Sequence, residues 1–468
     1  MSKVLLIDFG STYTKVVAVD LEKEEILGTA NGWTTVDTNI MDGLQQALTQ
    51  LFDKTGKLEF QRVLGCSSAA GGLKMIAIGL VPELTAEAAK RAALGAGAKV
   101  LGVYCHELSE YEINEIQELK PDIILLAGGT NGGNKSVILH NAKMLTELKS
   151  NVPIVVAGNK SVAPEIVKTL SVNKSHVYHT ENVMPKLNDL NIDPARAVIR
   201  EIFLKRITEA KGLNKANEFV DKLVMPTPAA VLKAVELLGA GSSNERGMGD
   251  LIAVDIGGAT TDIYSVGKGE PTRGGVAWRG LKEPFAKRTV EGDLGMRYSA
   301  AALLKAAGAH SIAEYLQELS PNKAEIEQEI IDYTAKVAQE TDYIPQTQKE
   351  IQFEIAMAKA CTKIGLDRHA GYLETYYAPQ GEALMQFGKD LTSVPAVIGT
   401  GGVVIRSQAP EKILEGAFFE TANPMVLKPV QPAIYIDELY IIASMGLLAE
   451  EYPDAALRIM KKYVVRRS

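Results

Sequence analysis

Short apolar runs recur along the chain, and several of them end at glycine-rich turns. Lys3–Ile7 and Leu251–Val254 each precede such a turn, and apolar residues resume at Lys15–Val19 and Asp262–Val266. Apolar runs bounded by glycine are typical of buried strands that end in tight turns. The pattern therefore predicts two β-hairpins, one at the start of the chain and one just past its middle.

Two further apolar runs end in glycine pairs. Asp122–Leu126 precedes Gly128-Gly129, and Ala396–Ile398 precedes Gly401-Gly402. Hairpin and glycine pair thus alternate twice along the chain. This order predicts a two-fold internal repeat, with one copy in each half.

Helical stretches separate these strands, and strand and helix segments that are mixed along the whole chain predict an α/β fold. The clearest linker is Gly239–Asp250, which is rich in glycine and serine, and we place the domain boundary there. The predicted helices are Thr85–Ala98, Ala163–Leu170, Ala195–Glu209, Pro228–Leu238, Gly295–Ala307, Ile326–Glu340 and Glu350–Ile364.

Composition narrows the class of protein. Fifty basic and 57 acidic residues give a formal net charge of −7, which predicts binding to neither nucleic acid nor a membrane surface. The three cysteines form no CxxC pair, which argues against a disulfide framework or a zinc ribbon. The apolar run at the N-terminus is interrupted by Asp8 and does not resemble a signal peptide. We therefore expect a cytoplasmic protein.

The two hairpin turns carry the candidate chemistry. An aspartate at a strand end repels phosphate, but it suits a phosphate site if hydrated Mg²⁺ lies between the two. Turn N–H groups and hydroxyls can then cradle the phosphate oxygens. We therefore expect Asp8 and Asp255 to hold the metal. The candidate phosphate ligands are Gly10, Ser11, Thr12, Thr14 and Lys15 in the first turn, and Gly257, Gly258, Ala259, Thr260 and Thr261 in the second.

These motifs resemble the two phosphate loops of the actin–Hsp70–sugar kinase (ASKHA) superfamily. Val397–Val404 is similar to its adenosine motif, Met225–Val231 to its first connecting helix, Leu439–Leu448 to its second, and Glu291–Gly295 to a helix start near the nucleotide. The resemblance implies two ribonuclease H-like domains around a nucleotide cleft, with ATP and Mg²⁺ as cofactors. It adds Gly292, Asp293, Gly399, Thr400, Gly401 and Gly402 to the expected nucleotide-binding residues.

The same resemblance implies three parts of the chain. Residues 1–249 would form the first domain and residues 250–436 the second. Residues 437–468 would form a C-terminal connecting helix that packs back on the first domain.

A narrower resemblance covers nearly the whole chain. Cys66–Lys74, Leu80–Lys90 and Arg288–Gly295 are similar to segments of the glutamate mutase accessory (MutL-type) family. That resemblance implies an ATP-dependent reactivation factor for an adenosylcobalamin-dependent mutase or aminomutase, working through nucleotide-driven opening and closing of its domains. Its implied partners are the mutase subunits and ATP or ADP, and a homodimer is left open.

Met225 departs from the ASKHA pattern. Hsp70-type proteins have a glutamate here that helps organise the metal and the attacking water, and methionine can do neither. The sequence therefore predicts a weak Mg²⁺-dependent ATPase, in which Asp255 or Asp262 orients the water.

Two other functions fit the same superfamily. A small-molecule kinase would need a general base near the acceptor hydroxyl, and no residue stands out for that role. A filament-forming or scaffold ATPase of the actin type would use ATP to control assembly.

A cobalamin-ligating histidine is a weaker reading of Asp367-Arg368-His369. In cobalamin-binding domains the pattern is Asp-x-His-x-x-Gly, whereas here Gly371 comes one residue early. We therefore interpret His369 as an ordinary residue at a helix end.

Overall fold

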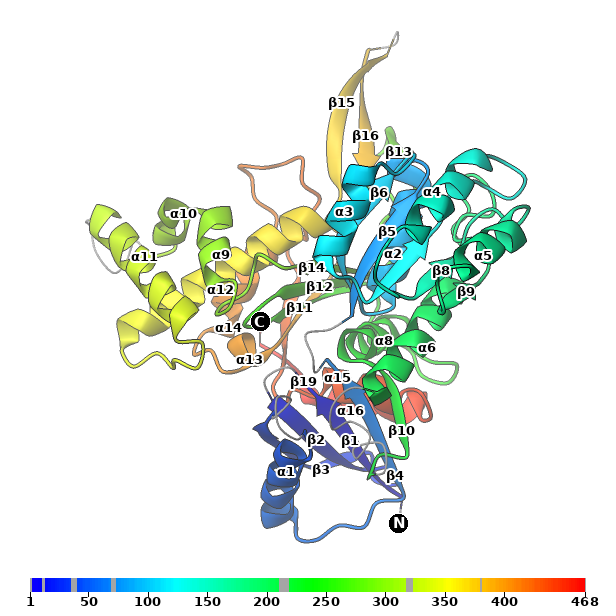
Figure 1. The fold of residues 1–468 in the computed structure, drawn as a ribbon. Coiled ribbons are helices and arrows are strands. Elements are labelled where there is room, and N and C mark those ends of the chain that lie inside the picture. Colours follow the sequence, from blue (N-terminus) through cyan, green and yellow to red (C-terminus); the bar gives the residue numbers. More distant parts are fainter. Residues whose placement is uncertain are drawn as a thin grey trace. The chain divides into compact units, whose positions relative to one another are not determined.

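The structure is a computed structural model that describes residues 2–10, 13–34, 40–68, 73–209, 219–316, 323–378 and 381–467. The chain divides into two compact units. Unit 1 comprises 1–231, 280–282 and 443–451, and unit 2 comprises 232–279, 283–442 and 452–468. Figure 1 labels the elements of both units.

Unit 1 contains two five-stranded sheets and the helices around them. Its strands are β1 (Lys3–Phe9), β2 (Tyr13–Asp20), β3 (Glu25–Trp33), β4 (Arg62–Ser67), β5 (Lys74–Gly79), β6 (Lys99–Cys105), β7 (Ile123–Leu126), β8 (Ile154–Val156), β9 (Val177–His179) and β10 (Lys222–Pro226). Its helices are α1 (Ile40–Thr55), η1 (Pro82–Ala86), α2 (Glu87–Gly95), α3 (Glu110–Leu119), α4 (Ser136–Thr146), α5 (Ala163–Ser171) and α6 (Asp193–Glu209). The chain passes to unit 2 within α8 (Thr227–Ala240).

Unit 2 contains a six-stranded sheet, a three-stranded sheet and a group of helices. Its strands are β11 (Leu251–Ile256), β12 (Thr261–Val266), β13 (Val276–Arg279), β14 (Ala286–Glu291), β15 (Tyr372–Ala378), β16 (Gly381–Phe387), β17 (Ala396–Thr400), β18 (Ala433–Asp437) and β19 (Val464–Arg466). Its helices are α9 (Ala300–Ala307), α10 (Ala309–Glu314), α11 (Lys323–Gln339), α12 (Gln348–His369), α13 (Gly402–Ile405), α14 (Pro410–Leu414), η2 (Glu415–Ala417) and α16 (Pro453–Tyr463). Nearly all of α15 (Ile442–Leu448) belongs to unit 1.

The predicted internal repeat is confirmed by the strand order of two sheets. In unit 1 the order is β10-β4-β1-β2-β3, and in unit 2 it is β18-β17-β11-β12-β14, with β19 added at the β18 edge. In each sheet the central strand pairs antiparallel with its hairpin partner and parallel with the strand on its other side. Both predicted hairpins, β1–β2 and β11–β12, are therefore present.

The prediction that Gly128-Gly129 is the counterpart of Gly401-Gly402 in the repeat was wrong. Gly401-Gly402 follows β17, and the strand that holds the equivalent place in unit 1 is β4, not β7. Gly128-Gly129 follows β7, which lies in a separate sheet. Both glycine pairs follow buried strands, and local pattern does not distinguish one sheet from another.

That separate sheet is a second α/β layer within unit 1, inserted between β4 and β10. Its order is β6-β5-β7-β8-β9, and all its neighbouring strands are parallel. One of the helices α2 to α5 connects each strand to the next along the chain, and they lie around the sheet in Figure 1. Parallel sheets are covered on both faces, so their strands are uniformly apolar, as the fully buried β7 and β8 show.

Each repeated sheet packs its apolar face against its own helices. In unit 1, α1 covers the β1–β3 side of the sheet through Leu44, Ala47 and Leu51, all fully buried. In unit 2, α12 packs along β11 and β12, and its start is fixed by a capping box between Thr347 and Glu350. Capping of this kind satisfies amide groups that would otherwise lack acceptors.

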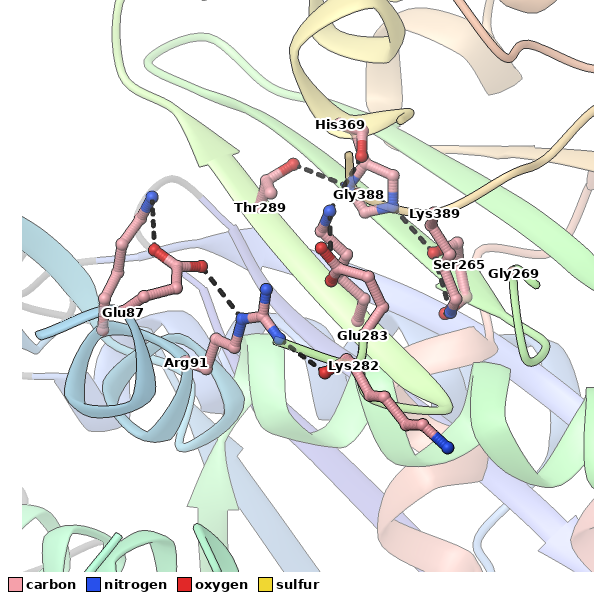
Figure 2. A network of polar contacts seen from close by, with 12 residues as sticks. Glu87, Arg91, Ser265, Gly269, Lys282, Glu283, Thr289, His369, Gly388 and Lys389 are labelled. Carbon is pink, nitrogen blue, oxygen red and sulfur yellow. Dashed lines mark hydrogen bonds and ion pairs between the residues drawn. The ribbon is translucent and has the colours of Figure 1, made fainter. Parts of the chain in front are cut away.

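A buried polar network ties the end of α12 to the unit 2 sheet (Figure 2). His369 is fully buried, with Nδ1 2.8 Å from the Thr289 hydroxyl and Nε2 2.8 Å from the Ser265 hydroxyl. The Lys287 ammonium donates to the carbonyl of His369, and the buried Lys389 ammonium donates to the Ser265 hydroxyl. Burial, and then the two lysines, hold the pKa of His369 well below its usual value. His369 is thus a structural residue rather than an ordinary helix end.

We expect acid to destabilise unit 2 through His369. As the pH falls below about 6.5, the unfolded chain binds a proton that the folded imidazole does not, so the free energy of unfolding falls by up to about 1.4 kcal/mol per pH unit. The His369→Gln variant should lack this component. Urea denaturation of both proteins between neutral and mildly acidic pH measures the difference. Parallel pH profiles would contradict the assignment.

Candidate phosphate-binding site

The two hairpin turns share one local geometry. In the first, the amide of Gly10 donates to the carbonyl of Tyr13 at 3.1 Å, and in the second the amide of Gly257 donates to Thr260 at 2.9 Å. Each turn therefore closes over the same number of residues. Ser11 and Thr12, predicted as phosphate ligands, lie outside the described residues.

In unit 2 the carbonyls of the second turn accept hydrogen bonds from residues 296–299. The three bonds are Met296 N–H to Gly257 at 3.1 Å, Arg297 N–H to Gly258 at 2.8 Å and the Ser299 hydroxyl to Ala259 at 2.7 Å. A Cβ on Gly295 would lie 2.4 Å from the carbonyl carbon of Ala259, so only glycine allows this close approach. The helix predicted over Gly295–Ala307 accordingly begins only at Ala300.

The amide groups of the same turn are available. Within the part of the chain that the structure describes, the N–H groups of Gly258, Ala259 and Thr260 donate to no acceptor. Successive free amides that line a turn form a concave site for an anion. The sequence-predicted residues Gly257 to Thr260 are thus brought together as a cradle of the kind that binds phosphate.

In unit 1 the carboxylate of Asp8 is buried and held by three side chains. Its Oδ1 accepts from the Thr227 hydroxyl at 2.6 Å and from the Cys66 thiol at 3.5 Å, and its Oδ2 lies 3.4 Å from the Lys15 ammonium. Burial, and then the Asp8 carboxylate, raise the pKa of the Cys66 thiol, which therefore remains a donor. Asp8 and Lys15 are together because they are paired residues of β1 and β2.

In unit 2 Asp255 holds the equivalent place. It pairs with Asp262 on β12 and with Thr400 on β17. A Cβ on Gly401 would lie 2.5 Å from the Asp255 carboxylate, and Gly401 has a φ of +88°. Gly401 therefore gives the carboxylate room, and the predicted adenosine motif and the second hairpin meet at this point.

Asp262 is engaged with a buried cation. Its Oδ1 accepts from Arg288, at 2.8 Å from Nε and 2.6 Å from the terminal nitrogen, and its Oδ2 lies 3.3 Å from the Thr260 hydroxyl. Arg288 is 5% exposed. Because a buried guanidinium needs a counter-ion, Asp262 has a structural role next to the turn.

Four other predicted residues make contacts within their own unit. The hydroxyl groups of Thr14 and Thr261 are buried and bonded to Thr34 and to the carbonyl of Leu294. Gly399 is packed so that a Cβ would lie 2.7 Å from Val404. The Gly292 carbonyl accepts from the Ser299 hydroxyl at 2.9 Å.

Asp293 is held by an ion pair. It accepts two bonds from Arg368, at 2.7 and 2.9 Å, and this pairing lowers the pKa of its carboxyl. Gly402 has open space at the Cβ position, as expected for a residue at the edge of a site.

Sequence reasoning missed several residues that hold the aspartates. Thr227 and Cys66 contact Asp8. Asp437 was also missed; it accepts from the Thr400 hydroxyl at 2.9 Å and from the amides of Ile441 and Ile442. Thr227 lay within a quoted motif, but its role depends on the pairing of β10 with β4, which is not local in sequence.

Two α/β units with the same sheet order, each with an aspartate at the central strand end beside a glycine-rich turn, define the duplicated actin-like fold. The sequence pattern of the MutL protein family matches residues 4–464. The chain therefore belongs to the MutL family.

Similarity to known proteins agrees with this. The chain is 54% identical to the protein MutL of Clostridium tetanomorphum over 470 residues, covering 100% of both chains. Likeness to solved structures is low. It has a TM-score of 0.34 to the ADPNP-bound activator of the 2-hydroxyisocaproyl-CoA dehydratase from Clostridium difficile, at 10% identity, covering 100% of this chain and 99% of that one.

The TM-score to ligand-bound xylulose kinase from Lactobacillus acidophilus is 0.37, at 9% identity, and the match covers 100% of this chain and 93% of the kinase. The TM-score to a nucleotide-free diol dehydratase-reactivating factor is 0.33, at 9% identity, and the match covers 96% of this chain and 99% of that factor. The actin-like fold is defined by the strand order that the two repeated sheets share.

The described residues lack two further features. They contain no group of three or more His, Cys, Asp or Glu side chains placed to hold a metal. Mg²⁺ bound to a nucleotide needs only one or two carboxylates, because phosphate and water complete its shell, so a single carboxylate beside a phosphate-binding turn is chemically suited to such an ion. Over the same ranges, no helix is both long and apolar enough to span a bilayer.

We expect Asp262→Asn to destabilise unit 2 strongly, because Arg288 would remain buried without its carboxylate partner. The expected loss is about 3–5 kcal/mol in the free energy of unfolding, measured by urea denaturation. The matched control is Asp342→Asn, which changes an exposed carboxylate of the same unit and should cost under about 0.5 kcal/mol. Equal stability of the two variants would show that Asp262 is not a structural counter-ion.

Proposed function

We propose that the chain binds Mg²⁺–ATP through its two hairpin turns and acts as a reactivation factor for an adenosylcobalamin-dependent mutase or aminomutase of the glutamate mutase type. Differential affinity for ATP and ADP would drive domain opening and closing, which the mutase subunits recognise. Hydrolysis would be weak, since β10 presents Met225, which is 1% exposed, where a glutamate would be expected.

The observation that carries the nucleotide proposal is the second turn. Its carbonyls accept hydrogen bonds from residues 296–299. The amides of Gly258, Ala259 and Thr260 have no acceptor within the described residues. Such a cradle suits the phosphate oxygens of ATP. The repeat supplies a turn closed by the same hydrogen bond beside Asp8.

The proposed roles follow the contacts. Asp8 and Asp255 would hold the hydrated metal, and the positive charge of the metal would also attract the phosphates. Asp255 is also the better candidate to orient water, since Asp262 is bonded to Arg288. Gly401, which leaves room for the Asp255 carboxylate, and Gly402 would lie at the adenosine side.

The proposed partner follows from family membership. The chain matches the MutL family over residues 4–464, and the sequence resembles accessory proteins of glutamate mutase. An accessory role agrees with the sequence, in which no residue stands out as a general base for an acceptor hydroxyl. A cobalamin mutase that holds damaged cofactor is the proposed client.

We expect Asp255→Asn to weaken Mg²⁺–ATP binding by about 10- to 100-fold, because a carboxylate that holds the hydrated ion is lost. Isothermal titration with ATP, with Mg²⁺ and with EDTA, measures the effect. Asp342→Asn serves as the exposed control in the same unit. Binding that is Mg²⁺-independent, or unchanged in Asp255→Asn, would refute the metal assignment.

Reactivation is tested with an oxygen-inactivated glutamate mutase. The full chain with Mg²⁺–ATP should restore turnover when fresh adenosylcobalamin is added, and Asp255→Asn should restore little. Failure of the wild-type protein despite tight ATP binding would overturn the accessory role and leave the nucleotide site standing. Consumption of ATP with a sugar or acid acceptor, or sedimentation of ATP-bound filaments, would instead favour the kinase or scaffold alternatives.

A further inference from the structure

The inserted sheet of unit 1 has a topology that creates a ligand-binding edge. Its order, β6-β5-β7-β8-β9, reverses direction between β5 and β7. In open parallel sheets, ligands bind outside the carboxyl ends of the strands at the point where the order reverses. In this sheet, that point lies where the chain leaves β5 at Gly79 and β7 at Leu126.

The segments that follow these two strands lie against each other. A Cβ on Gly128 would lie 3.7 Å from the amide nitrogen of Leu80, so the two turns are in contact at the switch point. The first turn is fixed by the buried Thr85 hydroxyl, which accepts from the amides of Leu80 and Val81. The edge is therefore built from two ordered turns.

The turn after β7 is braced by two buried asparagines. The Asn159 amide donates to the carbonyls of Gly133 and Asn134, at 3.2 and 3.0 Å, and its oxygen accepts from Gly132. Asn182 donates to the carbonyl of Gly129 at 2.9 Å. These bonds occupy the turn's carbonyls and hold its shape, as residues 296–299 do for the turn after β11.

The amides of this turn remain available. Within the described ranges, the N–H groups of Gly128, Gly129 and Thr130 donate to no acceptor, although Gly128 and Gly129 are buried. Buried amides without an acceptor are costly, which favours an acceptor from outside the chain. Three successive amides of this kind form an anion cradle.

The charges at this edge differ from those at the hairpin turns. Neither β5, which ends at Gly79, nor β7, which ends at Leu126, contains a carboxylate, whereas Asp8 and Asp255 are the next-to-last residues of β1 and β11. An anion at residues 128–130 would therefore not face a carboxylate on either of these two strands. A hollow of about 450 Å³ lies at the opposite edge of the same sheet, but its cations are already paired, Arg206 with Asp122 and Lys205 with Glu201.

From this geometry we propose that the inserted sheet carries a second, metal-independent site, which binds the phosphate group of a mononucleotide-sized ligand at residues 128–130. This site is separate from the proposed Mg²⁺–ATP site and does not depend on it. The ring of the ligand would lie along the switch point between the ends of β5 and β7.

The test is hydrogen–deuterium exchange of the full chain in EDTA, with inorganic phosphate, AMP and FMN as separate probes. With a probe at about ten times its Kd, exchange at residues 128–130 should slow about tenfold. Phosphate alone would identify a simple anion site, and protection by AMP or FMN only would identify a nucleotide site. No protection by any probe, or protection confined to residues 257–260, overturns the inference, and the latter result would support the ATP site.

Two glycine variants give a matched control. Gly129 and Gly132 both have left-handed φ values, +69° and +82°, so alanine strains the backbone at each. A Cβ at Gly129 would lie 2.2 Å from the carbonyl oxygen of Asn134, whereas one at Gly132 meets open space. Gly129→Ala should abolish the protection and Gly132→Ala should retain it. Protection that survives Gly129→Ala would place the ligand elsewhere.

Discussion

Each repeated sheet has a carboxylate at the end of its central strand. The neighbouring residues either bond to that carboxylate or leave space for it. In unit 1 the buried Asp8 is stabilised by the Thr227 hydroxyl, the Cys66 thiol and the Lys15 ammonium. In unit 2 Asp255 lies so close to Gly401 that a side chain there would displace it. A buried charge is tolerated only when such partners are in place. The strand pairing that brings them together is therefore a condition for the site as well as for the fold.

The sequence predicted those features that are local. Apolar runs and glycine turns were sufficient for both hairpins, because the turn length fixes the pairing of Asp8 with Lys15 and of Asp255 with Asp262. The sequence did not predict which strands pair when they lie far apart along the chain. Gly128-Gly129 was placed in the repeat because β7 and β17 are equally apolar, and strand character does not say which sheet a strand joins. Arg288 could not be identified as the partner of Asp262, since only the β12–β14 pairing brings them together.

The two halves have diverged in the charges around their aspartates. The residue paired with the central aspartate is Lys15 in unit 1 and Asp262 in unit 2, and the strand on its other side offers Cys66 or Thr400. Unit 1 therefore compensates its carboxylate with a nearby cation. Unit 2 places two carboxylates in register and neutralises one with a buried arginine. A duplicated framework thus presents one turn beside a carboxylate–ammonium pair and one beside two carboxylates and a buried arginine.

That asymmetry bears on how fast such a site could hydrolyse ATP. Met225 is buried in β10 beside Cys66, so the position taken by glutamate in Hsp70-type proteins contributes only packing. Asp262 is bonded to the buried Arg288, so its Oδ1 is already occupied. On the proposed roles, Asp255 would hold the hydrated ion together with Asp8 and would also orient water. A carboxylate with both roles would be consistent with the weak hydrolysis proposed for this chain. Slow turnover would suit the proposed conformational switch, because the ATP-bound state would have to outlast an encounter with the proposed client.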